Sequence, residues 1–322
     1  GDAGASVPVV DVSALVRDGA DSDALDAVAR SIRRACCEWG FFYVCKHGVG
    51  EQLQRDLDEC MQRFFAKRAE EKDALAMRVG GSAWRGFFPV GGELTSGKRD
   101  CKEGMYFGSH EPDAPRDAPM RGANLYDGDE MARAVERYMA AVVRLGAAVM
   151  RGVARSLLLD DDYFDRHYFS PSPTVLFRCF HYPPLSQWQR SDDASGDYTF
   201  SVGEHTDYGL LTLLRQDLVG GLEVQRASDG EWVAAPPLAN TFVCNIGDML
   251  ERVTRGVYRS TPHRVRNVSS SERYSYPLFF DPHFGARMHA LDEQRIAKVR
   301  AAAASTTSTG GGGSGGADGG GG

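Results

Sequence analysis

Two kinds of hydrophobic periodicity divide the chain near its middle. In the first half, apolar residues recur every three or four positions, as on an amphipathic helix. This spacing predicts a helix between a cap at Asp21 or Ser22 and a stop at Gly40, a second over 52–72 and a third over 129–159. Short apolar runs at 7–11 and 41–44 predict strands, the first at a sheet edge. The Gly- and Pro-rich stretch 80–128 predicts mostly loop.

From Thr174 onward the apolar runs become short and strand-like, with turn signals such as Asp229-Gly230 between them. Asn245 and Asp248, beside Gly247, are interpreted as determinants of such a turn. Helices first and strands afterwards predict an α+β chain whose β part is a sandwich or barrel, and a jelly roll has a suitable number of strands. The Ala-, Ser/Thr- and Gly-rich residues 301–322 cannot bury a core and predict a disordered tail.

Composition excludes several classes of function. Charged residues make up 25% of the 322 residues and hydrophobic residues 42%, which is ordinary for a soluble globular protein. The net charge of −7 and the lack of a basic run argue against nucleic acid or an anionic membrane surface as a partner. No apolar run approaches the roughly 18 residues of a membrane span. We expect a monomer.

The seven cysteines form no C-x-x-C pattern, and their odd number favours a reducing, cytoplasmic environment. The sequence starts without a methionine, so a targeting segment could precede Gly1.

The stretch Gly203-Glu204-His205-Thr206-Asp207-Tyr208-Gly209 carries the most informative chemistry. In an extended strand His205 and Asp207 project to the same side and can bind one ion. His263, far downstream, would complete a set of two imidazoles and one carboxylate. Such a set is the usual way in which proteins hold non-haem Fe(II) for oxygen activation. Zn(II) could bind the same side chains, although it favours four-coordinate sites with Cys or His.

A carboxylate-binding pair follows ten positions after His263. Arg273 and Ser275 again have the i, i+2 spacing, so both face one side of a strand. A guanidinium fork beside a hydroxyl is suited to binding a carboxylate with two hydrogen bonds. The sequence therefore predicts an organic acid that reaches from Arg273 to the metal.

Four segments together resemble the isopenicillin N synthase-like superfamily of Fe(II)- and 2-oxoglutarate-dependent dioxygenases. The N-terminal likeness lies in 7–11 and in Trp39-Gly40-Phe41-Phe42-Tyr43-Val44 with His47-Gly48-Val49. The others are His205-Thr206-Asp207-Tyr208-Gly209-Leu210-Leu211-Thr212-Leu213-Leu214, then 245–251 with 256–260 and His263-Arg264-Val265, and finally Arg273-Tyr274-Ser275. The resemblance covers roughly 7–290, and the combination of motifs is highly specific.

The resemblance implies a double-stranded β-helix, or jelly roll, with flanking N-terminal helices. It implies an N-terminal region over 1–160 and a dioxygenase region over 161–300 that form one compact unit. His205, Asp207 and His263 would bind Fe(II), while Arg273 and Ser275 would hold the distal carboxylate of 2-oxoglutarate.

Tyr182 lies where many members of the family have a tyrosine near that carboxylate. Plant-type members read Asn-Tyr-Tyr-Pro-Pro there, whereas this chain has Phe180 at the asparagine position and His181 after it. Any contact of that asparagine with the co-substrate is therefore absent. We interpret His181 as structural or exposed. Among the histidines outside the predicted metal site it is of most interest, because it precedes Tyr182.

The implied reaction consumes O2 and 2-oxoglutarate, releases succinate and CO2 and most often hydroxylates a small-molecule substrate. Two other functions stay open at this stage. One is an iron oxidase that does not use 2-oxoglutarate, of the isopenicillin N synthase or aminocyclopropane-carboxylate oxidase type, because such enzymes also use R-x-S for a carboxylate. The other is a binding protein that kept the fold without catalysis. The prime substrate depends on loops around 80–110 and 185–200 and is not identified by the sequence.

Overall fold

The computed structural model describes residues 6–115, 117–184, 200–266 and 270–307. Most of its helices come from the first half of the chain and its jelly-roll strands mainly from the second. The helices are α1 Ser13–Val16, α2 Ser22–Glu38, α3 Glu51–Phe65, α4 Ala69–Asp73, α5 Met77–Gly80, η1 Gly81–Ala83, α6 Gly128–Ser156, η2 Asp165–Phe169, α8 Asp248–Val253 and α9 Glu293–Thr307. The strands are β1 Val9–Asp11, β2 Phe41–Cys45, β3 Gly86–Phe88, β4 Leu94–Thr95, β5 Lys98–Arg99, β6 Glu103–Gly108, β7 Thr174–Tyr182, β8 Phe200–His205, β9 Leu211–Gln216, β10 Leu222–Gln225, β11 Trp232–Ala234, β12 Phe242–Ile246, β13 His263–Arg266 and β14 Arg273–Asp281.

The strands form a large and a small sheet. The large sheet has eight strands in the order β1-β2-β12-β9-β14-β7-β6-β3, and only β1 pairs in parallel with its neighbour. The small sheet has the order β11-β10-β13-β8 and is antiparallel throughout. The predicted edge strand at 7–11 is confirmed, because β1 ends the large sheet. A third pair, β4-β5, lies beside β8.

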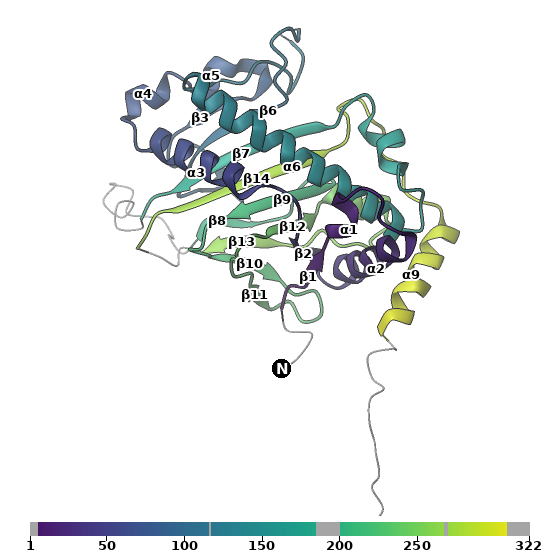
Figure 1. Cartoon of the computed structure of the whole chain (residues 1–322). Helices are drawn as coiled ribbons and strands as arrows, with labels where there is room; N and C mark the ends of the chain where they lie inside the picture. Colours follow the sequence, from purple (N-terminus) through teal and green to yellow (C-terminus); the bar gives the residue numbers. More distant parts are fainter. Residues whose placement is uncertain (1–5, 116, 185–199, 267–269, 308–322) are drawn as a thin grey trace, which may run out of the picture.

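Alternating side chains give the large sheet two apolar faces. In β2, Phe41 and Tyr43 belong to the core between the two sheets, whereas Phe42 and Val44 belong to the core beneath the helices. Figure 1 shows α6 running across the large sheet, with α3 and α2 on the same side. The predicted α+β jelly roll with flanking N-terminal helices is thus confirmed. In this sandwich, one face of the strands β7, β9, β12 and β14 is directed toward the small sheet.

The three predicted helices are present, with one boundary shifted. Asp21 caps α2, since its Oδ1 accepts a hydrogen bond from the Ala24 amide at 2.7 Å. The helix expected over 52–72 ends at Phe65, and α4 begins separately at Ala69. The third helix is confirmed as α6, which begins at Gly128 and ends at Ser156.

Most of the described part of 80–128 is loop, as expected, but the stretch also contains strands that the sequence did not predict, above all β6. All six residues of β6 are buried, and β6 joins β3 to the large sheet. Gly104 makes this possible, because a Cβ there would lie 2.5 Å from the Phe88 ring and 2.8 Å from the Phe180 ring. The glycine therefore allows close packing inside a strand, where composition alone indicated a turn.

The expectation that residues 301–322 form a disordered tail is wrong for 301–307. Residues 301–307 continue α9, whose Ile296 and Val299 are buried in the core near α2. Alanine has the highest helix propensity, so the run 301–304 extends a helix that is already anchored by packing. The Gly-rich residues 308–322 lie outside the described residues. Among the helices of the described ranges, none combines the length and the hydropathy that crossing a bilayer requires.

Candidate metal centre

Two adjacent strands of the small sheet bring the predicted histidines together. His205 ends β8 and pairs in register with His263, the first residue of β13. The centroids of the two imidazole rings lie 4.2 Å apart. Asp207 follows two residues beyond the end of β8, where its backbone oxygen accepts a hydrogen bond from the Asp248 amide at 2.8 Å. The i, i+2 pair predicted within one strand therefore spans the end of a strand and the start of a loop.

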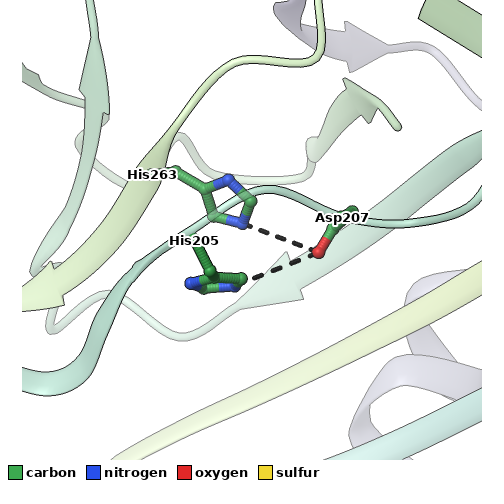
Figure 2. Close-up of side chains that lie close together, drawn as sticks. All are labelled: His205, Asp207 and His263. Atoms are coloured by element: carbon green, nitrogen blue, oxygen red, sulfur yellow. Dashed lines mark ion pairs between the residues drawn. The ribbon is translucent and has the colours of Figure 1, made fainter. Parts of the chain in front are cut away.

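The three side chains converge on one point (Figure 2). Asp207 Oδ1 lies 3.9 Å from His205 Nε2 and 3.8 Å from His263 Nε2. One ligand atom from each residue fits within a mutual separation of 4.8 Å. His205 Nδ1 lies 2.8 Å from the Gly203 carbonyl and His263 Nδ1 lies 3.2 Å from the Thr261 carbonyl. Since each Nδ1–H can donate to its carbonyl, each Nε2 keeps a lone pair directed to a metal.

The second oxygen of Asp207 is held by two side chains. Its Oδ2 accepts hydrogen bonds from Thr212 Oγ1 at 2.6 Å and from Asn245 Nδ2 at 2.7 Å. The interpretation of Asn245 as a turn residue is wrong, because it lies buried within β12. A polar residue inside an apolar strand needs a buried partner, and that pattern at Asn245 and Thr212 was the available sequence signal. Both donors leave Oδ1 free for a metal.

Burial and charge act in opposite directions on the ligand set. Burial lowers the pKa of His205, and the neighbouring His263 lowers it further. Burial by itself would raise the pKa of Asp207, but the two histidines and the two hydrogen bonds lower it overall. The carboxylate therefore stays ionised and the imidazole of His205 stays neutral near pH 7, which are the protonation states that bind a metal.

The predicted carboxylate clamp is assembled on two paired strands. Arg273 on β14 pairs in register with Tyr182 on β7, and its guanidinium carbon lies 4.6 Å from the tyrosine ring centroid. Ser275 Oγ lies 3.4 Å from the Tyr182 hydroxyl. Arg273 Nε donates to the Gly220 carbonyl at 2.7 Å, whereas its Nη1 is buried without a hydrogen-bond partner among the described residues. A buried guanidinium with an unused donor fits a carboxylate ligand.

One cavity of about 600 Å³ between the sheets contains the metal triad, Arg273, Ser275 and Tyr182. Phe180 faces this cavity from β7. His181 faces the opposite side, where its Nδ1 lies 2.8 Å from Glu103 Oε1 and its ring stacks on Tyr274. The structural interpretation of His181 is therefore confirmed. It borders a larger, more open cleft of about 1330 Å³ that contains none of the predicted site residues.

A jelly roll that brings two histidines and a carboxylate together near an unpaired buried donor indicates a non-haem iron oxygenase. Comparison with known proteins is consistent with this class. Residues 7–128 match the family of the N-terminal region of non-haem dioxygenases in morphine synthesis, and residues 173–282 match the 2OG-Fe(II) oxygenase superfamily.

Three curated proteins resemble the chain over most of its length. A probable iron/ascorbate oxidoreductase of Dictyostelium discoideum is 40% identical over 87% of this chain and 82% of its own length. A 1-aminocyclopropane-1-carboxylate oxidase of the same organism is 33% identical over 86% and 82%. The 2-oxoglutarate-dependent dioxygenase citB of Monascus ruber is 34% identical over 89% and 88%.

Among solved structures, a full-length protein of Neurospora crassa in complex with alpha-KG superposes with a TM-score of 0.76. It is 25% identical, and the match covers 95% of this chain and 98% of that protein. The chain belongs to the 2OG-Fe(II) oxygenase superfamily. It is an Fe(II)/2-oxoglutarate-dependent dioxygenase, and its cofactors are Fe(II), 2-oxoglutarate and O2.

The hydrogen bond from Thr212 to Asp207 gives a first prediction. Replacing Thr212 by valine keeps the shape of the side chain but removes the donor to Oδ2. Loss of a group that orients a metal ligand typically weakens metal binding by about 10- to 100-fold. We expect this change in the Kd for Mn(II), measured by calorimetry on chelator-treated protein. Thr212→Ser is the matched control, because it keeps the hydroxyl and removes only a methyl group. Equal Kd values for the valine variant and the parent protein would contradict the role of this bond.

Proposed function

We propose that the protein oxidises a small-molecule substrate by hydroxylation while it converts 2-oxoglutarate to succinate and CO2. In this proposal His205, Asp207 and His263 hold the iron. Arg273, Ser275 and Tyr182 hold the distal carboxylate of 2-oxoglutarate. Bound iron would supply the activation of O2 and the oxidative chemistry.

The observation that carries the proposal is the unpaired Nη1 of Arg273 in the cavity of the triad. A buried cation with an unsatisfied donor is costly, and a carboxylate ligand would relieve that cost. The Arg273 guanidinium is already fixed by its bond to the Gly220 carbonyl and by the Tyr182 ring, so little ordering is needed on binding. Ser275 adds a hydroxyl on the same side of β14.

The protein residues have two further tasks in this proposal. The hydrogen bonds at Nδ1 of each histidine and at Oδ2 of Asp207 fix the three ligand atoms before the metal arrives. Aromatic and aliphatic side chains of the inter-sheet core, such as Phe41, Phe180 and Val202, limit water in the cavity. Limited water strengthens the attraction between Arg273 and a bound carboxylate.

The proposed reaction predicts a stoichiometric link between its products. With Fe(II) and O2 supplied, succinate formation should require 2-oxoglutarate and should equal its consumption, because the decarboxylation produces one succinate per molecule. Mass spectrometry of succinate and of 2-oxoglutarate measures both quantities, and an oxygen electrode follows the O2 that is consumed. A candidate substrate that is hydroxylated gains one oxygen atom, which isotopically labelled O2 would reveal.

A second candidate function is an iron oxidase that does not use 2-oxoglutarate. This candidate is supported by the 33% identity to a 1-aminocyclopropane-1-carboxylate oxidase. Oxygen consumption with ascorbate and a substrate, but without 2-oxoglutarate, would favour this candidate. Oxygen consumption that stops when 2-oxoglutarate is removed would exclude it.

The prime substrate and the oligomeric state have separate tests. A second structure of the Neurospora crassa protein contains thymine beside alpha-KG, which supports a substrate of the small-molecule class for this chain. The segment 185–199, within the 185–200 loop expected to influence substrate choice, lies outside the described residues. A monomer remains a prediction that light scattering of the purified chain would test.

A further inference from the structure

Strand β7 places a second guanidinium in the cavity of the metal centre. Arg178 shares the inward face of β7 with Phe180 and Tyr182, and it lines the same cavity of about 600 Å³. Tyr182 is the partner of Arg273 in the sheet register. Tyr182 lies four positions beyond Arg178, which corresponds to about 13 Å between their Cα atoms along β7. The backbone of Arg178 therefore lies well away from that of Tyr182 in the carboxylate clamp.

Aromatic rings hold the Arg178 guanidinium, and no carboxylate of the described residues neutralises it by direct contact. Its guanidinium carbon lies 4.4 Å from the Tyr106 ring centroid and 4.7 Å from the Phe279 ring centroid. Its Nε is buried without a hydrogen-bond partner. Within the described ranges, the guanidinium makes neither a hydrogen bond nor an ion pair. The rings favour the cation electrostatically and fix its plane, but they leave its N–H groups unused.

Other enclosed cations of the fold make direct hydrogen bonds or ion pairs through their charged groups, although Arg85, like Arg178, also has a buried Nε without a partner. Arg33 donates to the Ser156 carbonyl at 2.6 Å, and Arg85 donates to the Ala83 carbonyl at 2.8 Å. Lys102, which lines the same cavity as Arg178, forms ion pairs with Asp100 and with Glu93, the latter at 3.0 Å. After Lys102 is neutralised and Arg273 is assigned to the co-substrate, Arg178 is the remaining uncompensated cation among the described residues that line this cavity.

Nearby acids do not take the place of a ligand. Glu93, Asp207 and Asp281 attract Arg178 through space, yet none of the three lies within ion-pair distance of it. Asp281 Oδ1 accepts a hydrogen bond from the Leu210 amide at 3.1 Å, and burial raises the pKa of this carboxyl to about 7. Glu93 accepts a hydrogen bond from the Tyr106 hydroxyl and forms an ion pair with Lys102. Burial in turn lowers the pKa of Arg178.

We propose that Arg178 binds the carboxylate of the prime substrate, which is therefore a small organic acid. The inference deepens the proposed function and rests on it, since it assigns Arg273 to 2-oxoglutarate. The unused N–H groups can donate two parallel hydrogen bonds to one carboxylate. Tyr106 and Phe279 then provide apolar surface beside the bound group. A single cation balances a single negative charge, so a monocarboxylate fits better than a phosphate dianion.

The test uses binding without turnover. Purified full-length protein is loaded with Mn(II) and 2-oxoglutarate in the absence of O2, and calorimetry measures binding of phenylacetate, 3-phenylpropanoate, hexanoate and L-phenylalanine. Each acid is compared with its primary amide, which has nearly the same shape but lacks the negative charge of the carboxylate. We expect at least one acid to bind ten or more times as tightly as its amide. Equal binding of acid and amide in all four pairs would overturn the proposal.

Variants connect this preference to one side chain. Arg178→Met should remove the preference for the acid, and Arg178→Lys, which keeps the charge but not the fork, should retain part of it. Arg264→Met is the matched control, because Arg264 also lies over an aromatic ring, that of Trp232, at 3.9 Å but outside the cavity. A preference that survives in Arg178→Met would refute the assignment.

Two measurements keep this inference separate from the proposed function. The Kd for 2-oxoglutarate should be unchanged in Arg178→Met, and the melting temperature without ligand reports whether that variant is folded. If 2-oxoglutarate fails to bind the parent protein, the proposed function fails, while the acid and amide titrations with Mn(II) alone still decide the role of Arg178.

Discussion

Replacing Asp207 by alanine is expected to abolish metal binding and, with it, succinate formation. Asp207 Oδ1 is the one carboxylate oxygen near both Nε2 atoms of the described metal cluster, at 3.9 Å and 3.8 Å. Its removal also leaves Thr212 and Asn245 without their acceptor. The Kd for Mn(II) should rise beyond the roughly 100-fold that loss of an outer-shell partner produces. Calorimetry and a succinate assay measure the two effects.

A nearby carboxylate provides the control for charge. Asp248 begins α8, and its Oδ2 accepts a hydrogen bond from Thr206 Oγ1 at 3.4 Å, so it lies close to the centre without joining the cluster. Asp248→Ala should bind Mn(II) within a few-fold of the parent protein. Tight Mn(II) binding by a folded Asp207→Ala variant would show that the metal lies elsewhere, and the proposed ligand set would then be abandoned.

The convergence of His205, Asp207 and His263 was predictable because these residues follow local rules. A His-x-Asp spacing places two ligands on one side of extended backbone, and the sequence contains the further histidine and the R-x-S pair downstream. The structure brings all of these into one cavity. The pairing of His205 with His263 depends on the register between β8 and β13. From the sequence we could infer only that the two strands that carry these histidines lie next to each other.

The supporting residues were not predictable in the same way. Thr212 and Asn245 lie on β9 and β12, and their common contact with Asp207 depends on which strands are neighbours. Arg178 is a charged residue in a largely apolar strand, and its spacing from Tyr182 indicates only that both share a face. Whether that face lines a cavity or a helix layer is decided by sheet packing, which no local pattern encodes. Strand β6 was missed for a related reason, since Gly104 serves close packing against Phe88 rather than a turn.

The two guanidinium groups of the cavity divide its electrostatics into separate parts. Arg273 has a fixed hydrogen bond to a carbonyl and an unused Nη1, whereas Arg178 is held by rings alone among the described residues. If each arginine binds one carboxylate, substitution of one arginine should leave carboxylate binding at the other arginine largely intact. Free-energy changes at sites more than about 7–10 Å apart with no shared partners are usually additive. This separation makes the substitution of Arg273 informative.

Arg273→Met is expected to weaken binding of 2-oxoglutarate strongly while metal binding is preserved. Loss of one partner of a buried, hydrogen-bonded charge pair costs about 2–5 kcal/mol. Since ~1.4 kcal/mol corresponds to a tenfold change, the Kd for 2-oxoglutarate should rise by roughly 30-fold or more. Calorimetry with Mn(II)-loaded protein measures this Kd. The Kd for Mn(II) should not change, because Arg273 is not part of the metal cluster.

The controls separate the guanidinium fork from charge in general. Arg273→Lys should lie between the parent protein and the methionine variant, because an ammonium keeps the charge but cannot form two parallel hydrogen bonds. Arg266→Met removes an exposed arginine of β13 that pairs with Glu223 at 3.5 Å, and it should leave the Kd for 2-oxoglutarate unchanged. If Arg273→Met binds 2-oxoglutarate as tightly as the parent protein does, the distal carboxylate lies elsewhere. The unused Nη1 donor would then need another ligand, and Arg178 would become the first alternative site for the co-substrate.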